Sequence, residues 1–261
     1  MREAVVGRQR IIQGDCMTVL AALPRASIDV VICSPPYNLG IAYHSYEDRK
    51  PRDVYLRWIA EFGHLIWQVL KPTGSFFLNI GSTNQDPWLS FDVAQRLRDT
   101  YILQNHIIWV KAISIGEESV GHFKPINSPR YLNQNHESIL HFTLSGNVPI
   151  DRLAIGVPFK DKSNIERRGH TQDRRCAGNV WYIPYETVQA KSQKFNHPAG
   201  FPLELPMRCI KLHGTPATVL DPFMGAGTTL LAAERLGQSG IGIELDAQYV
   251  DVAISRLHEP G

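Results

Sequence analysis

The sequence lacks several features that would place it in a common protein class. It has 4 cysteines in 261 residues, and none of them lies in a CxxC or CxxH spacing. This pattern indicates reduced thiols rather than a disulfide framework or a zinc site. No apolar run reaches the roughly 18 residues of a membrane span, and the first ten residues lack the apolar core of a signal peptide. We therefore expect a cytoplasmic protein without a membrane anchor.

Neither sign of charge dominates the chain. The 27 Lys and Arg residues stand against 25 Asp and Glu residues, so the net charge of +2 identifies no partner. Positive charge is concentrated in residues 151–175, which carry seven basic and four acidic side chains, a net charge of +3. A hydrophobic content of 43% over 261 residues is enough for a sizeable core and excludes a disordered chain. At about 150 residues per domain, one large domain or one domain with an appendage is expected.

The apolar pattern predicts strands alternating with helices. Residues 28–33 form a short β-branched run typical of a buried parallel strand. From Asp53 to Leu70, large apolar residues recur at the i, i+3, i+4, i+7 spacing of an amphipathic helix. The same reading predicts strands at 75–80, 106–110, 137–142, 217–220 and 240–243, and helices at 87–98, 202–212, 228–236 and 247–257. This alternation indicates an α/β fold with a mostly parallel sheet and helices on both faces.

A glycine-containing loop, residues 221–229, directly follows the strand expected at 217–220. Gly225 and Gly227 allow the backbone to turn tightly and to approach a ligand closely. Thr228 and Thr229 are expected to cap the helix that follows.

An acidic residue follows the next predicted strand. Glu244 lies 19 residues after Gly225, where a carboxylate can accept hydrogen bonds from both hydroxyls of a ribose. The loop has no third glycine, which favours a nucleoside cofactor without a pyrophosphate. A tight turn that binds no ligand is the alternative, and the presence of Asp221 and Glu244 at two strand ends argues against it.

A second loop, Ser34-Pro35-Pro36-Tyr37, directly follows the strand that ends at Cys33. The two prolines fix φ near −65° and favour extended geometry before them, so the tetrapeptide is stiff. The Ser34 hydroxyl and the Pro35 carbonyl could accept both hydrogens of an exocyclic amino group and orient the lone pair of its nitrogen. The ring of Tyr37 could stack on the attached base. An ordinary loop with a proline pair is the alternative.

Taken together, these motifs resemble those of the DNA amino-methyltransferases. The resemblance is to the permuted, β-type class, in which the catalytic tetrapeptide precedes the cofactor loop. Residues 34–37 match the catalytic motif in its SPPY form, and residues 221–229 match the S-adenosylmethionine loop. Residues 240–246 match the acidic ribose-binding strand end, residues 14–16 the short GD motif, and residues 197–202 the motif that opens the helix before the cofactor strand.

The resemblance implies a Rossmann-like, S-adenosylmethionine-dependent methyltransferase fold. Residues 1–142 would form the catalytic half of the domain, residues 143–196 a small basic target-recognition insert, and residues 197–261 the cofactor-binding half. The implied activity is site-specific transfer of a methyl group from S-adenosyl-L-methionine to N4 of cytosine in double-stranded DNA. It would proceed by direct displacement on a flipped base, without a metal or a covalent intermediate.

The resemblance leaves alternatives for the methylated base and for the class of substrate. An SPPY motif is usually associated with N4 of cytosine in this family, and DPPY or NPPY with N6 of adenine. N6-adenine methylation of DNA, methylation of an RNA base and an inactive DNA-binding protein are the alternatives. The family occurs in bacteria, archaea and phages. A cognate restriction endonuclease and a homodimer are compatible with the resemblance, and the sequence decides neither.

The resemblance also assigns individual residues. Ser34 and the Pro35 carbonyl would orient the amino group, Pro36 would stiffen the loop, and Tyr37 would stack on the flipped base. The residues expected at the cofactor are Asp15, Cys16, Ser34, His197, Asp221, Phe223, Gly225, Gly227, Thr228, Thr229 and Glu244. Those expected at DNA are Lys160, Lys162, Arg167, Arg168, Arg174 and Arg175.

Other prominent residues are expected to be structural. Phe76, Phe77 and Trp109 lie in strand patterns and should belong to the core. His136 and Glu137 resemble a family turn near the base pocket, but a His-Glu pair alone indicates a surface or structural role. Three aromatic residues should pack the insert onto the sheet: Trp181, Tyr182 and Tyr185.

Overall fold

A computed structural model gives the fold of most of the chain. It describes residues 2–40, 48–115, 118–121, 127–167, 169, 171–184, 200–214 and 216–259, with the backbone alone at 112–115 and 118–121. Within these residues, no helix combines the length and the apolar character needed to cross a membrane.

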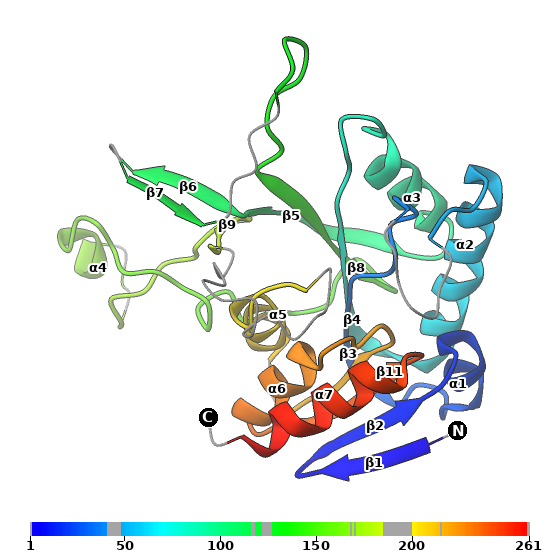
Figure 1. Cartoon of the computed structure of the whole chain (residues 1–261). Helices are drawn as coiled ribbons and strands as arrows, with labels where there is room; N and C mark the ends of the chain where they lie inside the picture. The colour runs from blue at the N-terminus through cyan, green and yellow to red at the C-terminus, as the bar shows by residue number, and fades with distance from the viewer. Residues whose placement is uncertain are drawn as a thin grey trace.

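The described residues contain one large sheet, with strands in the order β1-β2-β11-β10-β3-β4-β8-β5-β9 (Figure 1). Strands β2, β11, β10, β3 and β4 run parallel, whereas β1 and β8 are antiparallel to their neighbours. The predicted mostly parallel α/β sheet is therefore confirmed. The strand bounds are β1 Arg2–Val6, β2 Gln9–Gln13, β3 Ile28–Cys33, β4 Leu70–Ile80, β5 Ile102–Val110, β8 His136–Thr143, β9 Val180–Tyr182, β10 Thr218–Asp221 and β11 Ser239–Glu244.

Helices cover both faces of this sheet (Figure 1). One layer contains α1, α2 and α3, in which α2 contacts the other two. The other layer contains α5, α6 and α7, in which α6 is the central helix. The short helix α4 and the hairpin β6–β7 lie outside both layers. The bounds are α1 Cys16–Ala22, α2 Arg52–Val69, α3 Leu89–Leu97, α4 Ser163–Arg167, α5 Glu204–His213, α6 Thr228–Arg235, α7 Ala247–His258, β6 Ala112–Ile115 and β7 Glu118–Gly121.

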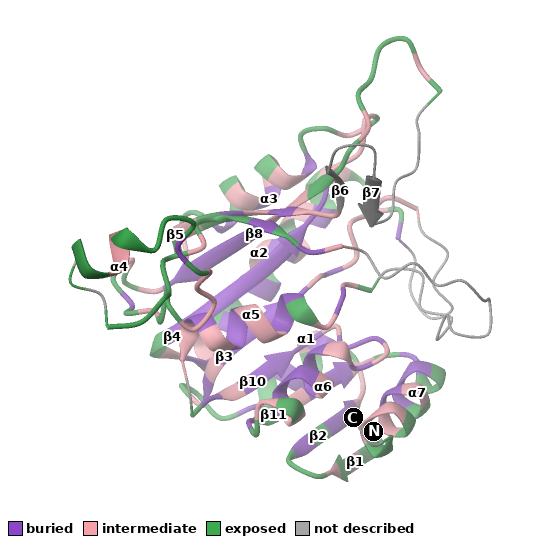
Figure 2. Ribbon diagram, turned by 90° about the vertical axis from the view of Figure 1, so that its left-hand side faces the viewer, coloured by how far each residue is buried: buried purple, intermediate pink, exposed green. Residues whose placement is uncertain are grey.

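The core is divided by the sheet, and β4 contributes to both sides (Figure 2). Because successive side chains of a strand point to opposite faces, Phe76 packs in the cluster under α1–α3 and Phe77 in the cluster under α5 and α6. Trp109 joins the second cluster, so all three residues are buried as predicted. Trp181 of β9 also packs there, as predicted, whereas Tyr182 is 54% exposed, so the prediction that it packs on the sheet was wrong. Tyr185 lies outside the described residues.

Strand β4 begins earlier than the sequence predicts. It starts at Leu70, immediately after α2, and includes the Lys-Pro-Thr-Gly segment expected to be a loop. Its register against β3 shifts between Ile28 and Val30, where Leu70 and Ser75 are the successive partners. This irregularity accommodates Pro72, which has no backbone N–H to give to the ladder.

A buried polar cluster joins β4, β5, β8 and α5. The His141 ring lies 3.0 Å from Ser75 Oγ through Nε2 and 3.0 Å from Asn105 Nδ2 through Nδ1. His213 Nδ1 lies 3.0 Å from the same serine oxygen. The Phe77 ring stacks on the His141 ring, with 4.4 Å between the ring centroids. Burial, and secondarily the nearby His213, lowers the pKa of His141 to about 4. The folded protein therefore holds this ring neutral.

The stability of the fold should depend on pH through His141. The unfolded chain takes up this proton near pH 6.5 and the folded chain only near pH 4, so stability is lost as the pH falls between these values. Between pH 7 and pH 4.5 we expect this group alone to cost roughly 2–3 kcal/mol of unfolding free energy. His141→Gln should reduce the pH dependence measured by urea denaturation, whereas the exposed control His64→Gln should not. Equal pH dependence of His141→Gln and wild type would contradict this assignment.

Candidate active site

The carboxyl ends of the parallel strands place the sequence motifs along one edge of the sheet. Glu244 of β11 pairs with Gln13 of β2, so Asp15 begins α1 beside it. Asp221 ends β10, and Cys33 ends β3 just before the Ser-Pro-Pro-Tyr loop. Segments far apart in the sequence therefore meet at this edge, where open α/β sheets bind their ligands.

Glu244, the last residue of β11, holds the Gly225 loop against this strand. Its Oε2 accepts a hydrogen bond from Gly225 N at 2.9 Å, and its Oε1 accepts one from Asp246 N at 2.8 Å. The Glu244 carbonyl accepts from Gly14 N at 2.9 Å, which joins the end of β2 to the same point. Burial raises the pKa of this carboxyl, and the backbone N–H groups oppose the rise. Two bonds leave further lone pairs on the carboxylate for other donors.

The loop between β10 and α6 turns at its glycines. Gly225 has φ 53° and Gly227 has φ 80°, both in the left-handed region that favours glycine. A Cβ at Gly227 would lie 2.8 Å from the Cβ of Ala253 in α7. The backbone at Gly227 thus packs directly on α7, which a side chain would prevent.

The prediction that Thr228 and Thr229 cap α6 was wrong. Gly227 occupies the cap position, and no side chain makes a capping hydrogen bond there. The Thr229 hydroxyl instead donates to Asp221 Oδ2, and Arg256 Nη1 donates to Thr228 Oγ1 at 3.1 Å. The sharp glycine turn takes the cap position, and tertiary partners take the two hydroxyls.

Asp221 is a buried acid at the start of this loop. Its Oδ1 accepts a hydrogen bond from Phe223 N at 3.0 Å, and its Oδ2 accepts the bond from Thr229. Burial raises the pKa of Asp221 to about 7; its two hydrogen bonds oppose this rise, and the Glu244 carboxylate adds to it. The group therefore changes charge near neutral pH.

The structure describes three more of the residues predicted at the cofactor, Asp15, Cys16 and Phe223. Asp15 caps α1 by accepting a hydrogen bond from Thr18 N at 3.0 Å. Cys16 is buried, and burial, with a contribution from Asp15, raises the pKa of its thiol to about 12. The half-buried ring of Phe223 lies 5.8 Å from that of Trp58 in α2. His197 lies outside the described residues.

The hydroxyl of Tyr37 lies where β3, β4 and β8 meet. It is 2.7 Å from Ser34 Oγ, and it accepts a hydrogen bond from Asn79 Nδ2 at 2.9 Å. It donates toward Glu137 Oε2 and the backbone carbonyl of Asn79, both at 3.2 Å. Burial raises the pKa of Tyr37 well above its ordinary value, and the Glu137 carboxylate adds to this rise.

The rest of the tetrapeptide is held from α2 and from the following turn. The Pro36 carbonyl accepts a hydrogen bond from the Tyr55 hydroxyl at 2.9 Å. The Asp48 carboxylate accepts from Asn38 N at 2.7 Å and from Leu39 N at 3.0 Å. These bonds add to the rigidity expected from the proline pair, whose first member is buried.

Two residues of this site were not assigned to it from the sequence. Asn79 was not singled out, although a polar residue within the apolar run of β4 is a signal that could have identified it. Glu137 was interpreted as a surface or structural residue because a His-Glu pair alone is uninformative. Since β8 runs antiparallel, its first residues lie at the active edge, and Lys111 Nζ binds Glu137 Oε1 there at 2.7 Å.

The predicted DNA-contacting residues that the structure describes lie between β8 and β9, outside the main sheet. The segment after β8 is fixed at the opposite edge, where Gln104 Nε2 donates to the Val148 carbonyl at 2.7 Å and Asp151 N to the Leu212 carbonyl at 2.8 Å. Arg168 lies outside the described residues. The other five predicted residues are exposed, and Lys162 pairs with Asp173: Lys160, Lys162, Arg167, Arg174 and Arg175.

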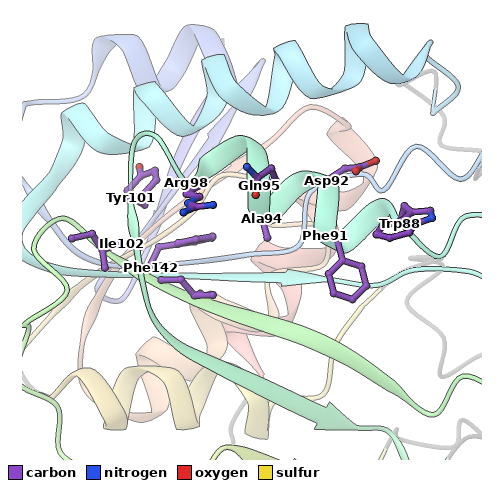
Figure 3. Close-up of a pocket in the computed structure, with 10 residues that line it drawn as sticks. Trp88, Phe91, Asp92, Ala94, Gln95, Arg98, Tyr101, Ile102 and Phe142 are labelled. Atoms are coloured by element: carbon purple, nitrogen blue, oxygen red, sulfur yellow. The ribbon is translucent and has the colours of Figure 1, made fainter.

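An open apolar groove of about 690 Å³ lies between α3 and the start of β5. Figure 3 shows Phe91 and Arg98 of α3 on one side of it, with Ile102 and Phe142 on the other. None of the residues predicted at the active edge lines this groove.

The chain is similar to known DNA methyltransferases. The DNA adenine methyltransferase YhdJ of Escherichia coli K12 is 26% identical over 252 residues, which cover 95% of this chain and 82% of that protein. PvuII DNA methyltransferase, which is cytosine-N4-specific, shares the fold with a TM-score of 0.72 at 20% identity, covering 100% of this chain and 91% of the other.

A third comparison concerns a cofactor complex. A putative DNA modification methylase from Thermus thermophilus, complexed with S-adenosyl-L-methionine, superimposes with a TM-score of 0.64 at 25% identity. The match covers 95% of this chain and 92% of the other. Residues 28–255 match the model of the N6_N4 DNA methylases, and this chain therefore belongs to that family.

Proposed function

We propose that the protein methylates N4 of cytosine at a specific site in double-stranded DNA, with S-adenosyl-L-methionine as the methyl donor. The observation that carries the proposal is the meeting of two loops at one sheet edge. Ser34 to Tyr37 follow β3, and the Gly225 loop follows the adjacent strand β10, held by Glu244. An amino-orienting loop thus lies beside a loop suited to a nucleoside cofactor. The serine at position 34 favours cytosine.

The residues at the cofactor loop fit S-adenosyl-L-methionine. Glu244 keeps carboxylate lone pairs beyond those used by Gly225 and Asp246, and these suit the two hydroxyls of a ribose. The glycines keep the backbone open to close approach. Asp15 is assigned to the adenine amino group. Asp221, which changes charge near neutral pH, suits the neighbourhood of a cationic ligand.

The tetrapeptide is assigned to the target base. The donor supplies a methyl group already activated by its sulfonium. Ser34 Oγ and the Pro35 carbonyl accept the two hydrogens of the exocyclic amino group and turn its lone pair toward that methyl group. Tyr37, whose hydroxyl is fixed by Asn79 and Glu137, offers a rigid ring for stacking. Such positioning can contribute on the order of 7–11 kcal/mol to lowering the barrier.

The domain roles follow from this assignment. We assign residues 1–142 to the catalytic half and residues 197–261 to the cofactor-binding half, the order of the permuted class. Residues 143–196 are assigned to target recognition, although β9 within them belongs to the main sheet. Their exposed cations are assigned to phosphates that flank the target base.

Mass spectrometry of nucleosides from plasmid DNA incubated with the protein and S-adenosyl-L-methionine tests the proposal. N4-methyldeoxycytidine is the expected product. N6-methyldeoxyadenosine, the product class of the relative YhdJ, would overturn the base assignment and keep the enzyme class. The absence of any methylated deoxynucleoside across several DNA sequences would favour an RNA substrate or a binding protein without turnover.

Ser34→Ala tests the assigned role of the hydroxyl. The variant should retain binding of S-adenosyl-L-methionine, because the Ser34 hydroxyl is assigned to the target amino group and the other residues expected at the cofactor are unchanged. Its kcat should fall about 10²–10³-fold, the scale for removal of one polar contact in the transition state. Single-turnover methylation together with calorimetric cofactor binding separates the two effects. Near-normal turnover would remove Ser34 from the mechanism.

Cofactor binding should depend on the charge of Asp221. A cationic ligand favours the ionised carboxylate, so binding should release a proton at pH values below the Asp221 pKa of about 7. We expect the affinity for S-adenosyl-L-methionine to rise up to about tenfold from pH 6 to pH 8. Calorimetry in two buffers of different ionisation enthalpy measures the released proton. Asp221→Asn should release correspondingly less, and equal proton release in both proteins would contradict the role of Asp221.

A further inference from the structure

Glu137 closes a chain of hydrogen bonds that ends at the Ser34 hydroxyl. Lys111 Nζ lies 2.7 Å from Glu137 Oε1, and Asn79 Nδ2 donates to Glu137 Oε2 at 2.7 Å. The Tyr37 hydroxyl lies 3.2 Å from the same Oε2 and 2.7 Å from Ser34 Oγ. The chain is mostly buried: the side chain of Glu137 is 16% exposed and that of Lys111 is 23% exposed.

Each donor in this chain faces an acceptor, while the buried Asn79 Oδ1 has no hydrogen-bond partner. The Asn79 amide has two hydrogens, and they go to Tyr37 and to Glu137. The Tyr37 oxygen has two acceptor positions and one hydrogen. One position receives a hydrogen of the Asn79 side-chain amide. The Tyr37 hydrogen points toward the Glu137 carboxylate and the backbone carbonyl of Asn79. The second acceptor position is then left for the hydrogen of Ser34.

The opposite direction, in which Tyr37 donates to Ser34, is less favourable. It would leave the Glu137 carboxylate without the tyrosine hydrogen in a largely buried setting. Hydrogen bonds to a carboxylate are roughly twice as strong as those between neutral groups. The carboxylate therefore sets the direction of the bond between Tyr37 and Ser34.

We propose that Glu137 is a positioning residue for methyl transfer, and that it acts through Tyr37 to make Ser34 a pure hydrogen-bond acceptor. The hydrogen of Ser34 is committed to Tyr37, so both lone pairs of its Oγ face other donors. This inference rests on the proposed function, in which those donors are the hydrogens of the target amino group. With its hydrogen toward the substrate, the same hydroxyl would oppose the amino group rather than orient it.

Glu137→Gln tests this chain because Lys111 controls how the new amide turns. The ammonium group of Lys111 is a donor only, so the glutamine oxygen faces it and the glutamine NH₂ faces Tyr37 and Asn79. Three donors then compete for the two acceptor positions of the Tyr37 oxygen. The Ser34 hydroxyl, which rotates freely, is the donor displaced.

The kinetic prediction is a selective loss of kcat. Glu137→Gln should lower kcat about 10–100-fold, while KM for DNA and Kd for S-adenosyl-L-methionine stay within about threefold. Asp29→Asn is the matched control. Asp29 is also a half-buried carboxylate paired with a lysine, Lys71, at 2.8 Å, but it lies at the opposite end of β3. It should leave kcat unchanged.

A double-mutant cycle separates positioning from a structural role. Tyr37→Phe keeps the ring and removes the hydroxyl through which Glu137 acts, so Glu137→Gln should cost nothing further in that background. In Glu137→Gln/Lys111→Met the amide can turn its oxygen back to Tyr37, and part of the lost kcat should return. This double variant also removes both charges of the ion pair, so it leaves no unpaired charge at the site. Additive losses, or no recovery, would overturn the proposal.

A spectroscopic measurement tests the hydrogen-bond direction without turnover. With ¹³Cζ-labelled tyrosine, the Tyr37 resonance is identified by its loss in Tyr37→Phe. Glu137→Gln should shift this resonance in the protein without DNA or cofactor, and Asp29→Asn should not. An unchanged resonance would overturn the inference even where wild type methylates DNA. A wild type without methyl transfer that still shows the shift would instead refute the proposed function.

Discussion

The parallel pairing of β2, β11, β10, β3 and β4 is the constraint on which the site depends. Parallel strands end at the same edge of a sheet, so each loop that leaves this edge is brought beside its neighbours regardless of its distance in the sequence. Glu244 uses this proximity by bonding the backbone of the Gly225 loop. Tyr37 uses it by meeting side chains from two further strands. The Gly225 loop and the Ser34–Tyr37 loop are therefore adjacent because the backbones of their strands pair.

The sequence predicts the parts of this arrangement that local patterns encode. Buried parallel strands appear as β-branched runs, and the alternation of Phe76 and Phe77 across β4 follows from the strand period. The glycine loop and the tetrapeptide were identified because unusual backbone demands require unusual residues. Strands β1, β2 and β9 were not predicted, since segments of three to five residues contain too little periodicity.

The remaining differences come from partners that no local rule includes. Thr228 and Thr229 have the composition of a helix cap, but Asp221 and Arg256 bind their hydroxyls. Asn79 becomes a site residue because β4 runs parallel to β3, and Glu137 because β8 lies antiparallel beside β4. A residue at the start of such a strand is as close to the active edge as one at the end of its neighbour, and sequence order gives no sign of this.

The antiparallel direction of β8 also decides where the basic segment is attached. Strand β8 ends at the edge away from the site, whereas β9 pairs with the last three residues of β5, which lie toward the active edge. The chain between them therefore leaves the sheet at the far edge and rejoins it toward the active edge. Its first residues can diverge without displacing the site, whereas its last residues are held against the strand end that precedes Lys111, the partner of Glu137.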